Sequence, residues 1–172
     1  RLLDVEVWGA DRLGDDGVAS AFWSRLESFE GTLVSFNGRG FDLPVLELQA
    51  LRHRLAAPRY FNERNGLRAR YGRHFDLYDF LSNSGVSRLR GGLDLLARLV
   101  GLPGKGEVSG GDVQSLWEAG RFDVVHRYCR DDVIQTYFLF LHVEHLCGRL
   151  SGEELRAAEE AGRRFREEVG SR

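Results

Sequence analysis

The sequence predicts an α/β fold with a partly parallel sheet. Short apolar runs of strand length alternate along the chain with longer segments in which apolar residues recur every three or four positions. Glycines close several of the longer segments, as they commonly do at the ends of helices. This alternation of strands and helices is typical of proteins whose helices cover a parallel or mixed sheet.

The first third of the chain predicts two strands, each followed by a helix. Residues 2–8 (LLDVEVW) alternate loosely between apolar and polar side chains, as a strand does, and 10–17 predict a turn-rich loop. A short apolar run at 32–36 predicts a buried strand, and a helix is expected at 42–55. Residues 18–30 predict an amphipathic helix with one apolar face, made by Val18, Phe22, Leu26 and Phe29.

The remaining two thirds predict mainly helices. Ser151, with Glu154 three residues later, has the pattern of a capping box at the start of the last helix. No internal repeat or interdomain linker is evident, so we expect one domain at 1–150 and a charged C-terminal helix at 151–172. The predicted elements are a loop at 56–74, a strand that runs into a helix at 75–82, and helices at 92–100, 113–120, 122–150 and 151–168.

Composition predicts a soluble protein of the cytoplasm. The chain of 172 residues is 42% hydrophobic and 29% charged, which suits one domain with a real core. No apolar run approaches the ~18 residues of a membrane span, so no membrane partner is expected. Cys129 and Cys147 make no zinc-binding pattern, and a net charge of −2 gives no global attraction for polyanions.

The stretch SFNGRGFDLP (35–44) places an aspartate where a predicted strand meets a predicted helix. Ligands bind at the carboxyl ends of strands in open α/β sheets. Gly38 and Gly40 would let the backbone turn sharply and let a ligand approach closely. The carboxylate of Asp42 would suit a hard divalent cation such as Mg²⁺. The plainer alternative is that Asp42 only caps the helix.

A second candidate group lies in HRYCRDDVIQTY (126–137). Tyr128 and Asp132 are four residues apart, so they share one face of the predicted helix. A phenol and a carboxylate on one face could both meet a water molecule at a metal site. Tyrosine–aspartate pairs at this spacing are usually surface residues, so the pair alone does not define a site.

Together the two stretches resemble the DEDD-type 3′–5′ exonucleases. Asn37, Phe41 and Asp42 give N-x-x-x-F-D after a strand, and Tyr128 and Asp132 give Y-x-x-x-D in a late helix. Four longer segments are similar to the corresponding segments of predicted exonucleases related to the proofreading domain of family B DNA polymerases. They are NGRGFDLPVL, DLYDFLS, GLPGK and YCRDDVIQTY. The resemblance implies a ribonuclease-H-like fold, with a mixed sheet flanked by helices.

The resemblance also implies roles for the matching residues. Asp42 and Asp132 would be ligands of two divalent ions, Mg²⁺ or Mn²⁺, and Tyr128 would orient the attacking water. Asn37 and Phe41 would contact the terminal nucleotide, with Phe41 as a stacking face. The implied reaction hydrolyses the last phosphodiester of a 3′ end and releases a nucleoside monophosphate.

Other positions fit the family pattern less specifically. Its histidine variant would need His at position 127, where this chain has Arg127, so the tyrosine variant is expected and His126 is an ordinary helix residue. Asp131 has the wrong spacing and should point elsewhere. Lys105 would contact a phosphate, although an ordinary loop lysine explains it equally well.

The family's first motif, D-x-E on a central strand, is matched poorly. Asp4 and Glu6 have its spacing, but only one predicted helix separates them from the strand at 32–36, whereas the family fold has further strands in between. One interpretation is that residues 2–8 form an edge strand, that the fold is truncated at its N-terminus, and that this chain is inactive or nearly so. The other is a compact variant in which Asp4 and Glu6 serve.

An arginine-rich segment predicts the substrate footprint. Residues 52–74 contain seven arginines and a single acid, with Tyr60, Phe61 and Tyr71 interleaved. Arginines would contact phosphates and the rings would stack on bases, which suits the 3′ end of a single strand, expected to be DNA. A solvated arginine-rich loop is the alternative for the segment. An exoribonuclease and a non-catalytic nucleic-acid-binding module remain alternative functions, because the motifs do not distinguish the sugar.

Overall fold

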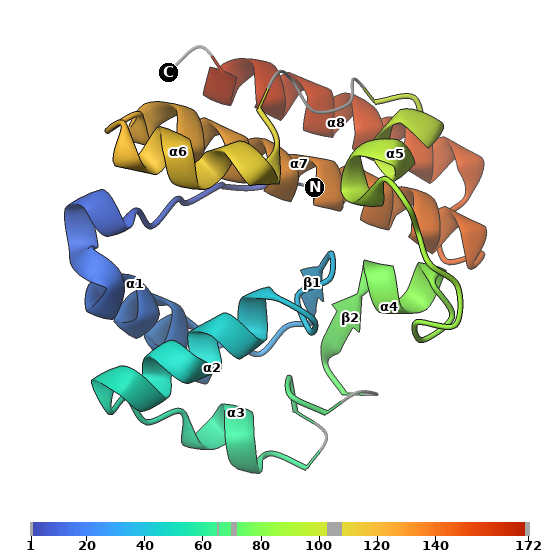
Figure 1. Ribbon diagram of the computed structural model, residues 1–172. Helices are drawn as coiled ribbons and strands as arrows, with labels where there is room; N and C mark the ends of the chain where they lie inside the picture. Colours follow the sequence, from blue (N-terminus) through green and yellow to red (C-terminus); the bar gives the residue numbers. More distant parts are fainter. Residues whose placement is uncertain (1, 65, 70–71, 103–107, 171–172) are drawn as a thin grey trace. The chain divides into compact units, whose positions relative to one another are not determined.

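The computed structural model describes residues 2–64, 66–69, 72–102 and 108–170 (Figure 1). The chain divides into two compact units. We call Trp8–Leu89 the N-terminal unit, and Arg1–Val7 together with Arg90–Arg172 the helical unit. Each unit has its own apolar core, and each is described by itself below.

The N-terminal unit contains a small parallel sheet. Strand β1 (Leu33–Ser35) pairs with strand β2 (His74–Asp76), in a register that sets Val34 opposite Phe75. These two strands make up the sheet of the described residues, so the predicted parallel pairing is confirmed while the sheet is smaller than expected. The helices of this unit are α1 (Ala10–Glu27), α2 (Asp42–His53), α3 (Pro58–Asn62) and α4 (Leu77–Leu81).

Trp23 of α1 lies in the core of the N-terminal unit. Its indole nitrogen donates a hydrogen bond to the carbonyl of Leu46 in α2 at 3.1 Å, and its ring meets that of Tyr60 in α3 at 4.8 Å between centroids. The buried face of α1 is therefore centred on Trp23, which the prediction left out. Of the predicted face, Leu26 is buried in this core and Phe22 and Phe29 are partly buried against it. Besides Trp23 and Tyr60, the buried members of this core are Ala19, Leu26, Leu43, Ala50, Ala57 and Leu67.

Helix α1 begins earlier than predicted. The amides of Arg12 and Leu13 donate to the carbonyl of Gly9, which starts a helical turn at Ala10. Gly14 then adopts a φ of 71°, which interrupts the helix with a kink before it continues to Glu27. The loop predicted at 10–17 is thus helical on both sides of one glycine, which supplies a backbone conformation that other residues rarely adopt.

Residues 2–8 do not form the predicted strand. Leu2 and Val5, three positions apart, pack against the core of the helical unit, while Leu3 is exposed. The carboxylate of Asp4 accepts a hydrogen bond from the amide of its neighbour Val5 at 2.8 Å. Leu2 and Val5 therefore bury their side chains against helices, and residues 2–8 are not part of the two-stranded sheet of the described residues. The assignment of residues 2–8 to a sheet edge was wrong.

The segment 56–74 is less irregular than predicted, because it contains α3. The carboxylate of Glu27, at the end of α1, accepts hydrogen bonds from the amides of Arg59 and Tyr60, both at 3.2 Å. These amides belong to the first turn of α3, where backbone donors have no partner within the helix. A side chain from a distant helix thus supplies the cap that the local sequence lacks.

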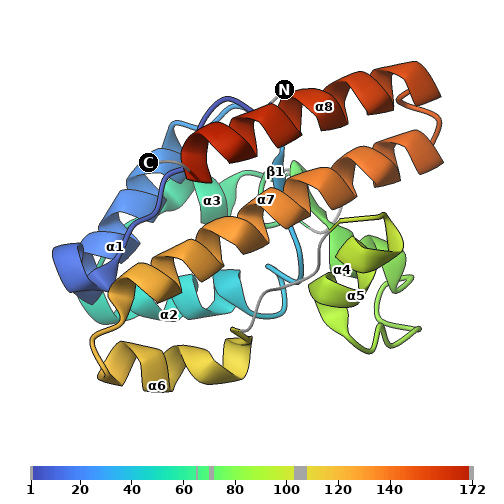
Figure 2. The ribbon, with the colours of Figure 1, turned by 90° about the horizontal axis from the view of Figure 1, so that it is seen from above.

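The helical unit confirms the predicted order of helices. It consists of α5 (Gly92–Leu99), the 3₁₀ turn η1 (Gly110–Asp112), α6 (Val113–Glu118), α7 (Phe122–Leu146) and α8 (Gly152–Gly170). Helices α7 and α8 lie side by side in both ribbon views (Figures 1 and 2), and α5 also packs on α7. Their shared core contains Ala97, Ile134, Phe138, Leu141 and Leu155.

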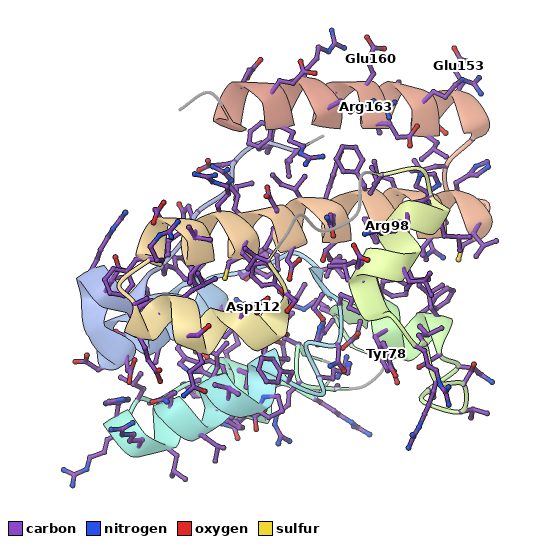
Figure 3. The ribbon with its side chains drawn as sticks, turned by 45° about the horizontal axis from the view of Figure 1, so that its top comes forward. Tyr78, Arg98, Asp112, Glu153, Glu160 and Arg163 are labelled. Atoms are coloured by element: carbon purple, nitrogen blue, oxygen red, sulfur yellow. The ribbon has the colours of Figure 1, made fainter. Side chains whose placement is uncertain are left out.

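The start of α8 is capped as predicted. The amide of Ser151 donates to the carboxylate of Glu154 at 2.8 Å, and the amide of Glu154 donates back to the Ser151 hydroxyl at 3.2 Å. These bonds lower the pKa of Glu154. On the far side of α8, Glu153 and Glu160 point away from α7 (Figure 3). In the described ranges, no helix has both the length and the apolarity needed to cross a membrane.

Candidate functional site

A compact turn connects β1 to α2. Asn37 adopts a left-handed conformation, with φ of 61°, which Asn tolerates better than most residues. Its carbonyl accepts hydrogen bonds from the amides of Gly40 and Phe41, at 3.1 and 3.0 Å. The carbonyl of Gly38 accepts from the amide of Leu43, already in the helix, at 2.8 Å. The turn therefore leads directly into the first turn of α2.

Both glycines of the turn lie close to neighbouring side chains. A Cβ atom at position 38 would lie 2.5 Å from the hydroxyl oxygen of Ser35, and one at position 40 would lie 2.5 Å from the side-chain oxygen of Asn37. At position 38 the Cβ of Ser35 would also lie only 2.7 Å away, so the close approach requires a glycine there. At position 40 the contact is with the end of the flexible Asn37 side chain, so a glycine is favoured but a shift of that side chain could make room.

The turn presents three side chains predicted to act at the site. Asn37, Phe41 and Asp42 are all exposed, and 65% of the Phe41 side chain is accessible. Phe41, not Asp42, occupies the N-cap position of α2, and the Phe41 side chain makes no capping hydrogen bond. The cap interpretation of Asp42 is therefore wrong. As the first helical residue, Asp42 carries its negative charge at the positive end of the helix dipole.

A residue outside the predicted site, Asp76, organises this turn. It ends β2 and is only 5% exposed. Its carboxylate accepts hydrogen bonds from the turn amides of Asn37 and Arg39, at 2.8 and 2.9 Å. It also accepts from the amides of Tyr78 and Asp79, at 3.0 and 3.4 Å, and so caps α4. The sequence signal that could have revealed it is an aspartate placed just before a short helix.

The side chain of Arg39 fixes the turn from the other direction. Its guanidinium donates hydrogen bonds to the carbonyls of Arg68, Ala69 and His74, at 3.3, 3.1 and 2.8 Å. The turn is therefore bound to the β2 region in two ways. Its backbone amides donate to Asp76 at the end of β2, and the Arg39 side chain donates to carbonyls before and at the start of β2.

His74 joins the two strands beneath the turn. Its Nε2 lies 2.7 Å from the hydroxyl oxygen of Ser35, and the side chain is buried. Burial, reinforced by the nearby positive charge of Arg39, lowers the pKa of His74 to about 4. The imidazole is therefore neutral at neutral pH, and it serves as a hydrogen-bonded cross-link between β1 and β2.

Tyr128 and Asp132 lie on one face of α7, as predicted, and both are half-buried. The hydroxyl of Thr136, one turn further on, donates to the backbone carbonyl of Asp132 at 2.8 Å. Beside them, a Cβ atom at Gly110 would lie 3.5 Å from the Tyr128 hydroxyl oxygen. The turn η1 therefore lies against the phenol, and a glycine at position 110 leaves room there.

The turn η1 is itself closed by a capping box. The hydroxyl and the amide of Ser109 both donate to the carboxylate of Asp112, at 2.6 and 2.8 Å, and these bonds lower the pKa of Asp112. Asp112 stands where η1 joins α6 (Figure 3). The local sequence S-G-G-D therefore sets the shape of the backbone beside Tyr128.

Comparison with known families gives this arrangement a context. The sequence model of a family described as predicted 3′–5′ exonucleases related to the exonuclease domain of PolB matches residues 2–169. The chain belongs to this family. The match confirms the resemblance and extends it to both sides of the segment 31–150. No curated protein and no solved structure matches the chain.

Within this exonuclease-related chain, the predicted residues fall into two groups. Asn37, Phe41 and Asp42 lie together on one turn of the N-terminal unit, and Tyr128 and Asp132 lie together on α7 of the helical unit. In the part of each unit that the structure describes, no three Asp, Glu, His or Cys side chains are grouped as metal ligands.

The remaining predicted site residues stand apart from these groups. Asp4 and Glu6 are exposed on the irregular segment before α1. Lys105, predicted to contact a phosphate, lies outside the described residues.

Tyr60 of the arginine-rich segment belongs to the core rather than to a binding surface. It is 3% exposed, and its hydroxyl donates to the carboxylate of Glu47 at 2.8 Å. Burial and this bond to a carboxylate raise the pKa of Tyr60. The prediction that Tyr60 stacks on a base was therefore wrong. Its ring is buried against Trp23 of α1 and its hydroxyl is bound to Glu47 of α2, and neither contact can be read from the local sequence.

Three arginines of the segment are engaged in ion pairs. Arg59 contacts Glu30 at 2.9 Å, Arg68 contacts Glu47 at 3.2 Å, and Arg73 contacts Glu63 at 2.8 Å. Exposed side chains that match the predicted footprint are Arg52, Arg54, Arg64 and Phe61, whose ring lies 5.4 Å below the Arg68 guanidinium. Arg70 and Tyr71 lie outside the described residues.

Proposed function

We propose that the protein is a metal-dependent 3′–5′ exonuclease, whose reaction releases nucleoside monophosphates from the 3′ end of single-stranded DNA, and that this chain supplies 3′-end binding and part of the metal site. The observation that supports it most is the family match over residues 2–169, which includes both the Asp42 turn and the Tyr128–Asp132 face of α7. The geometry of the turn is compatible with this proposal, because Asp42 is exposed at the first helical position of α2, directly after the glycine-rich turn.

The residues have the chemistry that this reaction needs. Carboxylate oxygens of Asp42 and Asp132 are the ligands that Mg²⁺ and Mn²⁺ prefer. Two such ions, when bound, would supply an activated water and would stabilise the leaving oxygen. The phenol of Tyr128 would orient the water by a hydrogen bond. Phe41 would stack on the terminal base, and the side-chain amide of Asn37 would hydrogen-bond to the same nucleotide.

Asp4 and Glu6 are not assigned to this site. Both are exposed on a segment that is not a strand, whereas the family's first acidic pair is carried by one. The expected consequence is that the 172-residue chain binds a 3′ end but cleaves it slowly or not at all.

The test measures 3′-end cleavage and binding together. A 5′-labelled single strand of DNA or RNA is incubated with the chain and Mg²⁺ or Mn²⁺, and products are resolved by length. Affinity is measured by fluorescence anisotropy on a strand with a non-hydrolysable 3′ linkage. The variants are Asp42→Asn and Asp132→Asn, with Asp131→Asn as the matched control next to Asp132.

The proposal expects metal-dependent affinity for a free 3′ end that both variants lose and the control keeps. Any cleavage should proceed stepwise from the 3′ end. If cleavage occurs and is lost in an Asp4→Asn, Glu6→Gln double variant, the compact alternative is correct for the first acidic pair. If the chain neither cleaves nor binds a 3′ end in a metal-dependent way, the proposed function is wrong.

A further inference from the structure

We propose that Asp76 is a positioning residue of the exonuclease site, which fixes the direction of Asp42 through the turn that carries it. This inference rests on the proposed function, because it assigns Asp76 a role through Asp42. Asp76 itself is buried and contacts backbone amides, so it is not expected to touch substrate.

The two oxygens of the Asp76 carboxylate accept hydrogen bonds from different backbone amides. Oδ1 accepts from the amides of Asn37, Tyr78 and Asp79, whereas Oδ2 accepts from the amide of Arg39. Hydrogen bonds to an ionised acceptor are stronger than those between neutral groups, and a buried amide that loses such a partner is costly. A single charge therefore supports two backbone segments.

The capping of α4 does not account for this arrangement. A helix cap explains the bonds to Tyr78 and Asp79, which are local in sequence. The bonds to Asn37 and Arg39 span 39 and 37 residues, and they are the two shortest that the carboxylate makes. The shortest hydrogen bonds of Asp76 are thus those to the turn and not those that cap α4.

A continuous set of hydrogen bonds leads from Asp76 to the backbone around Asp42. Asp76 binds the amide of Asn37, and the Asn37 carbonyl in turn binds the amide of Phe41, immediately before Asp42. The Gly38 carbonyl binds the amide of Leu43, immediately after it. The left-handed backbone of Asn37 is a sparsely populated conformation that persists only where its surroundings support it.

Two substitutions separate the two roles of Asp76. In Asp76→Ser, the hydroxyl still caps α4, since serine is a favoured cap, but one short oxygen cannot reach both turn amides. In Asp76→Asn, one oxygen acceptor remains and an NH₂ group replaces the other, so one amide loses its partner. The control is Tyr60→Phe, which removes a buried hydrogen bond to Glu47 in the same unit and leaves the turn intact.

Each protein is measured well below its own melting temperature, so that all are folded. Amide hydrogen exchange of residues 37–43 reports on the turn, and that of residues 78–82 reports on α4. Affinity for a single-stranded 3′ end is measured with and without Mn²⁺. A purely structural role would lower the melting temperature without changing the Mn²⁺-dependent affinity of the folded protein.

The expected result is that Asp76→Ser keeps α4 protected, accelerates exchange in the turn, and weakens the Mn²⁺-dependent affinity about 10–100-fold, as loss of a residue that orients a metal ligand typically does. Asp76→Asn should fall between this variant and wild type, and it provides the test if Asp76→Ser does not fold. Tyr60→Phe should retain full affinity.

Unchanged turn exchange, or unchanged affinity in both folded Asp76 variants, overturns the inference while the proposed function stands. If wild type itself shows no Mn²⁺-dependent binding, the proposed function fails and the role through Asp42 fails with it. Turn exchange in the variants then still decides whether Asp76 holds the turn.

Discussion

Acidification should destabilise the N-terminal unit through one histidine, His74. The side chain is 3% exposed, and its Nδ1 has no hydrogen-bond partner among the described residues. Burial and the charge of Arg39 lower its pKa from 6.5 to about 4, while the carboxylates of Asp76 and Asp79 oppose this effect. Protonation would thus place a positive charge where the fold stabilises the neutral ring.

The size of the effect follows from proton linkage. Between pH 4 and 6.5 the unfolded chain binds a proton at His74 that the folded chain does not. The contribution of His74 to the free energy of unfolding is therefore complete above pH 6.5 and falls as the pH is lowered. At about 1.4 kcal/mol per pH unit, about 3 kcal/mol would be lost by pH 4.

The assay is urea unfolding of wild type and His74→Gln at several pH values between 7.5 and 4. Glutamine is neutral throughout this range and can still hydrogen-bond to Ser35. Carboxylates also titrate at the acidic end, so the difference between the two proteins is the informative quantity. The free energy of unfolding of wild type should fall relative to that of His74→Gln as the pH is lowered. Parallel stability curves, or an NMR titration that places the pKa of His74 near 6.5, would refute this reasoning.

Two further predictions concern the helical unit. Gly110→Val should weaken Mn²⁺-dependent 3′-end binding or cleavage, because its Cβ would already lie at contact distance, 3.5 Å, from the Tyr128 hydroxyl oxygen and its two methyl groups would crowd that hydroxyl. Gly111→Val is the matched control and should behave as wild type in the same assay, because its Cβ would contact Ser109 and not Tyr128. Equal behaviour of the two variants would show that room beside the phenol is unimportant. Ser151→Ala should lower the free energy of unfolding by about 1 kcal/mol through loss of the α8 cap, as measured by thermal or urea unfolding, and no change would contradict the capping box shared with Glu154.

The elements predicted well from the sequence are those whose stability is mainly local. The long apolar periodicity of α7 and the Ser151–Glu154 pattern at α8 are readable within a few residues. Residues 2–8 were misjudged because alternation shows only that a segment suits a strand. Whether it pairs depends on distant parts of the chain, and here helices cover Leu2 and Val5.

The candidate site shows the same division. The position of Asp42 at the start of α2, beside a glycine-rich turn, and the shared face of Tyr128 and Asp132 follow from the sequence pattern alone. Asp76 could not be linked to the turn in this way, since its partners are backbone amides 37 and 39 residues away. Tyr60 was assigned to a binding surface because composition does not reveal that Trp23 lies against it.

The central claim is that Asp42 and Asp132 serve one metal-dependent function. A double-mutant cycle tests it most directly, with Mn²⁺-dependent affinity for a single-stranded 3′ end measured in wild type, Asp42→Asn, Asp132→Asn and the double variant. We predict that each single substitution removes most of the Mn²⁺-dependent affinity and that the double variant is scarcely weaker than either. Losses that add independently, or single variants that bind as wild type does, would contradict the claim.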